Sequence, residues 1–194
     1  LVAQARAAAA GRLADAVMAE LAPLKLDKAR FVVRLHPLAE TDWSGEGAER
    51  VGYEIATNPG QTSGPLAKIA SGGELARVML ALKVVLAKVG STSCLVFDEV
   101  DTGIGGATAD AVGERLARLG AAAQVLVVTH APQVAARADH HWRVEKAVRR
   151  GRTTISVSRL SEDERREEIA RMLAGARITE AARAAADSLI RESA

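Results

Sequence analysis

Two adjacent carboxylates, Asp98 and Glu99, follow a short apolar run and are the residues best suited to chemistry in this chain. An aspartate at the tip of a strand can hold Mg²⁺ through water, and a glutamate one residue later can orient or deprotonate an attacking water. His130 follows the next apolar run and could donate a hydrogen bond to a phosphate oxygen. These types and spacings predict phosphoryl-transfer chemistry, with Asp98 as the metal ligand and Glu99 and His130 as the catalytic residues.

The sequence Ser71-Gly72-Gly73-Glu74 is a second candidate, because it precedes an apolar stripe at helical spacing. Free N–H groups and the helix dipole attract anions to a helix N-terminus, and glycines let phosphate oxygens approach the backbone. We therefore expect Ser71, Gly72, Gly73 and Glu74 to bind a nucleotide.

The order of elements should bring the carboxylates and the histidine together. The pattern predicts strands at 94–97 and 125–128, with a helix between them after a glycine-containing loop. Such a crossover is right-handed and sets the two strands parallel, so that both end at the same edge of the sheet. Both runs are wholly apolar, which is typical of strands buried on both faces. Cys94 is accordingly expected in the core.

The rest of the chain shows helical and strand-like periodicity on either side of this unit. Further helices are predicted over 1–22, 74–89, 132–138, 161–173 and 179–191, and further strands over 29–37, 49–57, 141–145 and 153–159. Ser161 and Glu164 have the spacing of a capping box. The basic turn at 149–152 could touch DNA phosphates, although a solvated hairpin turn is the simpler interpretation.

The composition is that of an ordinary globular chain. It has 194 residues, 48% of them hydrophobic, and a net charge of +2 that does not by itself indicate nucleic-acid binding. A single cysteine excludes an intramolecular disulfide and fits a reducing compartment. No apolar run approaches the roughly 20 residues of a membrane helix. We expect a cytoplasmic protein without a membrane partner.

These motifs together resemble those of the ABC-type ATPases. Ser71–Leu75 resembles their signature motif, Leu95–Glu99 their Walker B, Asp101 their D-loop and His130 their switch histidine. Longer segments around these motifs resemble one family in particular, the RecN family, which are SMC-like ATPases of bacterial DNA repair whose heads are joined by a coiled coil. The segments are Ile69–Leu75, Asp98–Gly106 and Thr129–Ala135, and the whole resemblance covers most of 60–175.

The resemblance implies an α/β fold, namely the C-terminal lobe of a P-loop NTPase-like ABC/SMC ATPase head. The lobe would cover 23–194, with a mostly parallel sheet flanked by helices, and 1–22 would be the end of a coiled-coil arm. It further implies that two heads of a homodimer sandwich ATP and Mg²⁺. Each nucleotide would lie between the Walker A of one head and Ser71–Glu74 of the other, with Asp101 also at the nucleotide. The associated role is double-strand break repair by recombination on nucleoid DNA.

Several features leave alternatives open. No Gly-x-x-x-x-Gly-Lys-Ser/Thr occurs in the chain, so Walker A is expected from an N-terminal lobe of the same protein, and this chain alone should hydrolyse little or no ATP. Ala70, Glu74 and Val100 depart from the transporter pattern. An ABC transporter ATPase and a non-catalytic DNA-tethering clamp remain as alternative functions. Asp101 is also compatible with a plain cap of the following helix.

Overall fold

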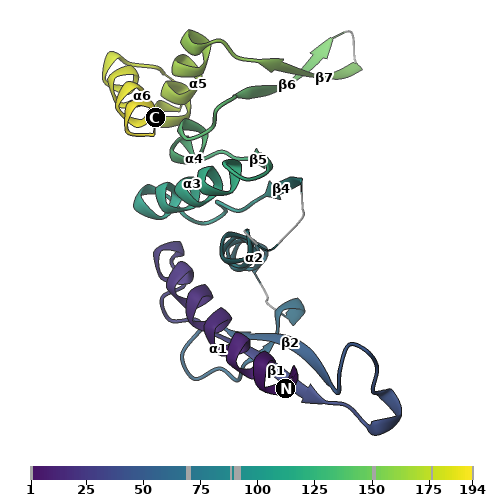
Figure 1. The fold of residues 1–194 in the computed structure, drawn as a ribbon. Helices are drawn as coiled ribbons and strands as arrows, with labels where there is room; N and C mark the ends of the chain where they lie inside the picture. The colour runs from purple at the N-terminus through teal and green to yellow at the C-terminus, as the bar shows by residue number, and fades with distance from the viewer. Residues whose placement is uncertain are drawn as a thin grey trace.

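The computed structural model describes residues 2–68, 71–87, 89, 93–149, 152–175 and 177–193. The α-helices are α1 (Val2–Leu21), α2 (Gly72–Leu86), α3 (Gly106–Gly120), α4 (Pro132–Ala136), α5 (Glu162–Ala174) and α6 (Glu180–Glu192). The strands are β1 (Arg30–Pro37), β2 (Glu49–Ala56), β3 (Gly64–Pro65), β4 (Cys94–Asp98), β5 (Gln124–Val128), β6 (Trp142–Arg149) and β7 (Arg152–Arg159). Figure 1 shows α2 between the α1 and β1–β2 unit on one side and α3 with β4 and β5 on the other.

Helix α1 leads into an antiparallel sheet. Its alanine-rich sequence favours a helix, which ends before Pro23 because proline cannot donate a backbone hydrogen bond. Lys25 then takes a left-handed conformation, with φ 60°, and the chain reverses into β1. Strands β1 and β2 pair antiparallel from Arg30 opposite Ala56 to Pro37 opposite Glu49. The strands predicted over 29–37 and 49–57 are thereby confirmed, and β3 adds a short third strand.

The predicted strand–helix–strand unit is present as β4, α3 and β5. Strands β4 and β5 pair in parallel, with Cys94 opposite Gln124 and Asp98 opposite Val128. The α/β prediction is confirmed, and among the described strands parallel pairing is confined to this pair. Helix α2 ends at Leu86 rather than at Val89 as expected.

The burial of β4 and β5 differs from the prediction. Phe97 is buried against the helices, but Val96, Leu126 and Val128 on the opposite face are 67%, 51% and 62% exposed. Cys94 is exposed as well, so its predicted place in the core is wrong. The reason is that the described helices cover only one face of this pair, whereas a parallel sheet in a complete domain is covered on both.

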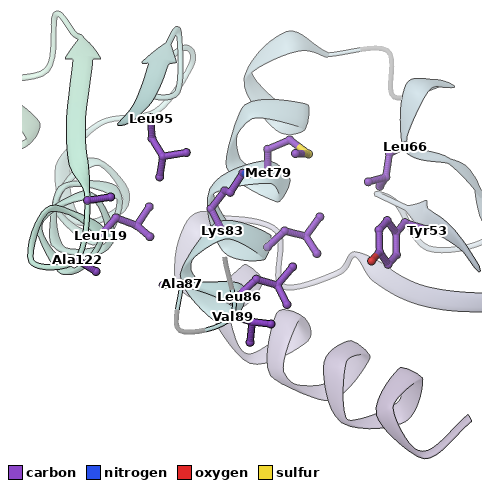
Figure 2. A pocket seen from close by; sticks show the side chains of 12 residues that line it. Tyr53, Leu66, Met79, Lys83, Leu86, Ala87, Val89, Leu95, Leu119 and Ala122 are labelled. Carbon is purple, nitrogen blue, oxygen red and sulfur yellow. The ribbon is translucent and has the colours of Figure 1, made fainter. Parts of the chain in front are cut away.

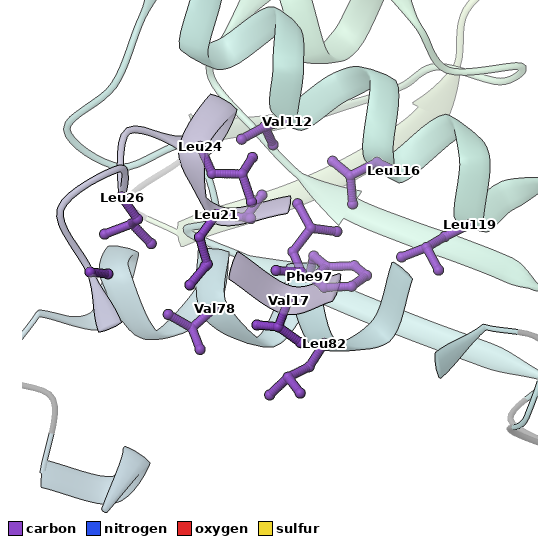
Figure 3. Close-up of a cluster of buried hydrophobic side chains, with 14 of the residues drawn as sticks. Val17, Leu21, Leu24, Leu26, Val78, Leu82, Phe97, Val112, Leu116 and Leu119 are labelled. Atoms are coloured by element: carbon purple, nitrogen blue, oxygen red, sulfur yellow. The ribbon is translucent and has the colours of Figure 1, made fainter. Parts of the chain in front are cut away.

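One large hydrophobic core joins α1, α2, α3 and the β4–β5 pair. Figure 3 shows side chains from these elements converging around Phe97. Val17 and Leu21 of α1 are fully buried there. The C-terminal part of α1 therefore shares the core of the lobe. That residues 1–22 are the end of a coiled coil, with a domain boundary after residue 22, stays a prediction.

The C-terminal part contains a hairpin and a helix pair. Strands β6 and β7 pair antiparallel from Trp142 opposite Arg159 to Arg149 opposite Arg152. The capping box is confirmed, because the Ser161 side chain accepts from the Glu164 N–H while the Glu164 side chain accepts from Ser161 N–H at 2.8 Å. Helices α5 and α6 pack with α4 around a second, alanine-rich cluster.

Some expectations fall on residues that the structure does not describe. Ile69 and Ala70 of the predicted signature segment, and Arg150 and Gly151 of the basic turn, lie outside the described residues. Within the described ranges, none of the helices combines the length and hydropathy needed to cross a lipid bilayer.

Candidate functional site

The predicted catalytic side chains lie at the carboxyl ends of two neighbouring strands. Asp98 is the last residue of β4, Glu99 follows it, and His130 comes two residues after the end of β5. Because Asp98 is paired with Val128 in a parallel register, the segments that follow both strands leave the same edge of the sheet. All three side chains are exposed, His130 to 74%, so they are accessible to a ligand.

Glu99 has an unusual backbone conformation for a residue other than glycine. Its φ is 59°, in the left-handed region, and its carbonyl accepts a hydrogen bond from Thr102 N at 3.1 Å. The next two residues, Val100 and Asp101, are fully buried. Such a conformation costs about 1–2 kcal/mol and persists only when its surroundings hold it. The buried neighbours hold Glu99 at the sheet edge with its carboxylate exposed.

The first turn of α2 lies beside Glu99. Ser71 caps the helix, its hydroxyl accepting a hydrogen bond from Glu74 N at 3.3 Å. A Cβ added to Gly72 would lie 3.9 Å from Glu99 Oε2, so the glycine turn and the carboxylate are close neighbours. Ser71 and Gly72 are exposed at the N-terminus of α2, next to the predicted catalytic residues, and free N–H groups at a helix N-terminus are suited to binding an anion. Glu74, in the same first turn, is half-buried.

Gly73 differs from Gly72 because it is buried. A Cβ at this position would lie 3.0 Å from the Thr102 carbonyl oxygen and 3.3 Å from Arg77 Nη1. The loop after β4 therefore packs closely against α2 at Gly73, where a larger side chain would force Thr102 or Arg77 to shift.

Asp101 is fully buried and binds the segment that carries His130. Its Oδ2 accepts hydrogen bonds from Thr129 Oγ1 at 2.5 Å, Ala131 N at 3.0 Å and His130 N at 3.2 Å. His130 Nδ1 lies 3.5 Å from the same oxygen. The alternative that Asp101 caps the next helix is wrong, because Gly105 occupies the N-cap of α3. The structure gives Asp101 a positioning role, and its contact with a nucleotide stays a prediction.

The sequence analysis missed Arg77. This residue is 6% exposed, and its Nη1 donates a hydrogen bond to the Thr102 carbonyl at 3.2 Å. Burial lowers the pKa of the Arg77 guanidinium, and the negative charge of Glu74 opposes that effect. A signal was available, because Arg77 follows Gly73 by four residues, and a helix places residues four apart on the same face.

The metal prediction rests on a single carboxylate. Within the described ranges, no group of three or more His, Cys, Asp or Glu side chains is placed to hold a metal ion. Mg²⁺ commonly uses one or two carboxylates, with phosphates and water completing its coordination. Asp98, exposed at the end of β4, fits that donor set when a nucleotide supplies the remaining oxygens.

An apolar cavity of about 350 Å³ lies elsewhere, between α2, β2 and the end of α3. Figure 2 shows Tyr53 and Leu66 on one side of it, Met79 and Leu86 on α2, and Leu119 across from them. Among the described residues that line this cavity, Lys83 is the one charged residue, and none is a predicted site residue.

Two comparisons show what this chain resembles. It is 47% identical over 187 residues to the DNA repair protein RecN of Xylella fastidiosa strain 9a5c, covering 96% of the chain and 34% of the relative. It is 51% identical over 171 residues to RecN of Deinococcus radiodurans, covering 88% of the chain and 30% of the relative. The chain thus spans about a third of the length of these curated relatives. No family model matches it.

The fold is similar to that of SMC heads. The Smc head of Pyrococcus yayanosii, solved with a coiled coil and joint, matches 81% of this chain and 28% of its own with a TM-score of 0.57 and 20% identity. The Smc head of Pyrococcus furiosus, solved with an extended coiled coil and the C-terminal domain of ScpA, matches 82% of this chain and 37% of its own with a TM-score of 0.53 and 19% identity. By sequence the chain is therefore similar to RecN proteins over 88–96% of its own length, and its fold is similar to that of part of an Smc head.

Proposed function

We propose that this chain is the catalytic C-terminal part of an SMC-like ATPase, which hydrolyses ATP between two heads during recombinational repair of DNA double-strand breaks. The observation that carries the proposal is the placement of Asp98, Glu99 and His130 at one edge of the sheet, where two parallel strands end. The name of the relatives, DNA repair protein RecN, supports the role in repair. The site would work in the cytoplasm, on nucleoid DNA.

Each side chain has a distinct role in this proposal. Glu99 accepts a proton from the attacking water or orients it, and Asp98 holds Mg²⁺ through water. His130 donates a hydrogen bond to the γ-phosphate. Bound Mg²⁺-ATP supplies the phosphoryl group and the metal charge that offsets the charge developing on it. The exposure of all three side chains supports these roles, because each must reach a ligand.

The helix terminus at Ser71–Glu74 serves a different nucleotide. We assign its N–H groups and the Ser71 hydroxyl to the ATP bound by the second head, so that ATP closes the homodimer and hydrolysis opens it. The phosphate cradle of each site comes from an N-terminal lobe that carries Walker A, a sequence that this chain lacks. A complete site therefore needs both lobes and both heads.

The experiment is ATP turnover by three samples: this chain alone, the full-length protein, and this chain co-expressed with the N-terminal polypeptide. We expect turnover in the last two samples only, and its loss when the pair carries Glu99→Gln. Equal turnover by the chain alone would contradict the composite site. ATP binding and head closure without any turnover would favour the non-catalytic clamp instead.

A further inference from the structure

The loop that follows β4 contacts both the helix with the glycine turn and the segment with His130. We propose that Arg77 is a positioning residue, which pins this loop against α2 so that the loop fixes the main chain at His130. The inference rests on the proposed function, because it concerns the regulation of the same site. The loop would then connect two parts of one chain: the helix terminus at Ser71–Glu74, which we assign to the ATP of the second head, and His130, which we assign to the ATP of the chain's own head.

The first half of the connection runs from α2 to Thr102. Arg77 Nη1 donates to the Thr102 carbonyl at 3.2 Å, and this carbonyl fits into the space left by the missing side chain of Gly73. A hydrogen bond from a charged donor is stronger than one between neutral groups, and here the donor is 6% exposed. The position of Thr102 is thus tied to the first two turns of α2.

The second half runs from Asp101 to β5. Asp101 is the neighbour of Thr102 in the chain, and its fully buried carboxylate accepts hydrogen bonds from Thr129 Oγ1 and from the N–H groups of His130 and Ala131. Consecutive Cα atoms are held about 3.8 Å apart, so Thr102 cannot shift far without moving Asp101 as well. Movement of Asp101 would change the support of the main chain at His130.

Bonds within the loop allow it to move as one piece. Thr102 N donates to the Glu99 carbonyl at 3.1 Å, and Ile104 N donates to the Asp101 carbonyl at 3.3 Å. Val100 is fully buried and anchors the start of the loop. Loosening this turn at Thr102 therefore leaves Asp98, within β4, in place.

The first test is a double-mutant cycle in the full-length protein. Arg77→Met keeps the aliphatic bulk and removes the donors, and we expect kcat to fall roughly 10- to 100-fold. KM for ATP should stay within about twofold, because Arg77 does not touch the nucleotide of its own head. Arg77→Lys retains one charged donor and should recover part of the loss. Lys83→Met, a charge removed from the same helix away from the loop, is the matched control.

The cycle is completed with His130→Ala. If Arg77 acts through His130 and its loop, the Arg77→Met, His130→Ala double variant should turn over ATP little more slowly than His130→Ala alone. If the fold-losses in kcat of the two single variants multiply in the double variant, the proposal is overturned. Arg77 would then act independently of His130, for instance on the nucleotide bound by the partner.

Hydrogen–deuterium exchange of the full-length protein gives a readout that does not depend on activity. We expect faster exchange at the amides of His130 and Ala131 in Arg77→Met, intermediate exchange in Arg77→Lys, and wild-type exchange in Lys83→Met. Unchanged exchange at these amides in both Arg77 variants would overturn the proposal. If the wild-type protein had no ATP turnover, the proposed function would fail while this test of Arg77 still gave an answer.

Discussion

At the scale of single residues, Glu99 combines an exposed carboxylate with a backbone conformation that glycine would adopt more easily. Its φ of 59° is retained next to the fully buried Val100 and Asp101. Non-glycine residues in this region are concentrated at functional sites, where the surrounding structure compensates for the strain. The strain is independent of the side-chain charge, and this permits a clean test of the carboxylate.

Glu99→Gln in the full-length protein should keep the shape of the side chain and the strain of the backbone while removing the proton acceptor. We expect ATP turnover to fall about 10²- to 10⁴-fold, the usual contribution of a general base, with ATP binding and ATP-driven dimerisation retained. Steady-state turnover and equilibrium nucleotide binding measure the two effects separately. Turnover near the wild-type rate would remove Glu99 from the catalytic role, and a lower melting temperature would indicate a structural one.

At the scale of elements, ion pairs join α5 to α6 in addition to their apolar cluster. Arg166 pairs with Asp187 at 2.6 Å, and Arg183 pairs with Glu167 at 2.6 Å. The hydrogen bond from Arg183 lowers the pKa of Glu167, and that from Arg171 lowers the pKa of Glu168. By contrast, α2 and α3 are joined to the rest of the chain mainly through an apolar core.

His141, like Glu167 and Glu168, stabilises the folded state less as the pH falls. Burial lowers its pKa, the charge of Arg165 lowers it further, and Glu168 opposes both. A histidine with a depressed pKa is neutral in the folded state, so the unfolded chain takes up its proton first as the pH falls through about 6.5. Glutamates with depressed pKa values likewise stabilise the fold above about pH 4.3, and this contribution is lost as the pH falls through their folded pKa.

We therefore expect acid to open the α5–α6 pair before the core around α3. As the pH is lowered from about 7.5 to about 4, exchange protection in α5 and α6 should fall first, because every shifted group named here loses its stabilising effect in that direction. Pulse-labelled hydrogen exchange of the full-length protein measures both regions at once. In Glu168→Gln, the exchange protection of α5 and α6 should depend less strongly on pH below about pH 5. Simultaneous loss of protection in α3 and α5 would contradict the prediction.

At the scale of the whole molecule, the proposed site takes its catalytic residues from one head and its helix terminus from the other. Ser71→Arg would block the helix terminus, and Glu99→Gln would disable the catalytic carboxylate. Each variant alone should form homodimers without an intact site. A mixed dimer, however, would contain one intact site, built from Glu99 of the first protein and Ser71 of the second.

Mixing the two inactive full-length variants should therefore restore ATP turnover. Random exchange of subunits would give about a quarter of the wild-type rate, since half of the dimers would be mixed and each would hold one working site of two. Turnover measured against the mixing ratio should be greatest for equal amounts. No recovery despite proven subunit exchange would contradict a site shared between heads.

Much of the element order could be predicted from the sequence, because its signals are local. The capping box at Ser161 and Glu164 and the proline after α1 marked helix ends correctly. The burial of β4 and β5 could not be predicted in this way. Periodicity shows that Val96 and Leu126 are apolar, but which face is covered depends on elements distant in sequence.

Part of the candidate site could also be predicted from the sequence. Parallel topology was enough to place Asp98, Glu99 and His130 at one edge of the sheet. The link through Arg77 and the burial of Asp101 were not foreseen, because both depend on contacts across about 25–30 residues of chain. Motif spacing identifies groups that could meet a ligand, whereas it says little about the groups that hold them.

The uncovered face of β4 and β5 also bears on the fate of a truncated product that carries only this lobe. Val96, Leu126 and Val128 are exposed, and so are Trp142 and Val144 on the hairpin. Apolar surface of this kind attracts chaperones and proteases and promotes aggregation. We expect a fragment with this surface to aggregate or to be degraded quickly in the cell.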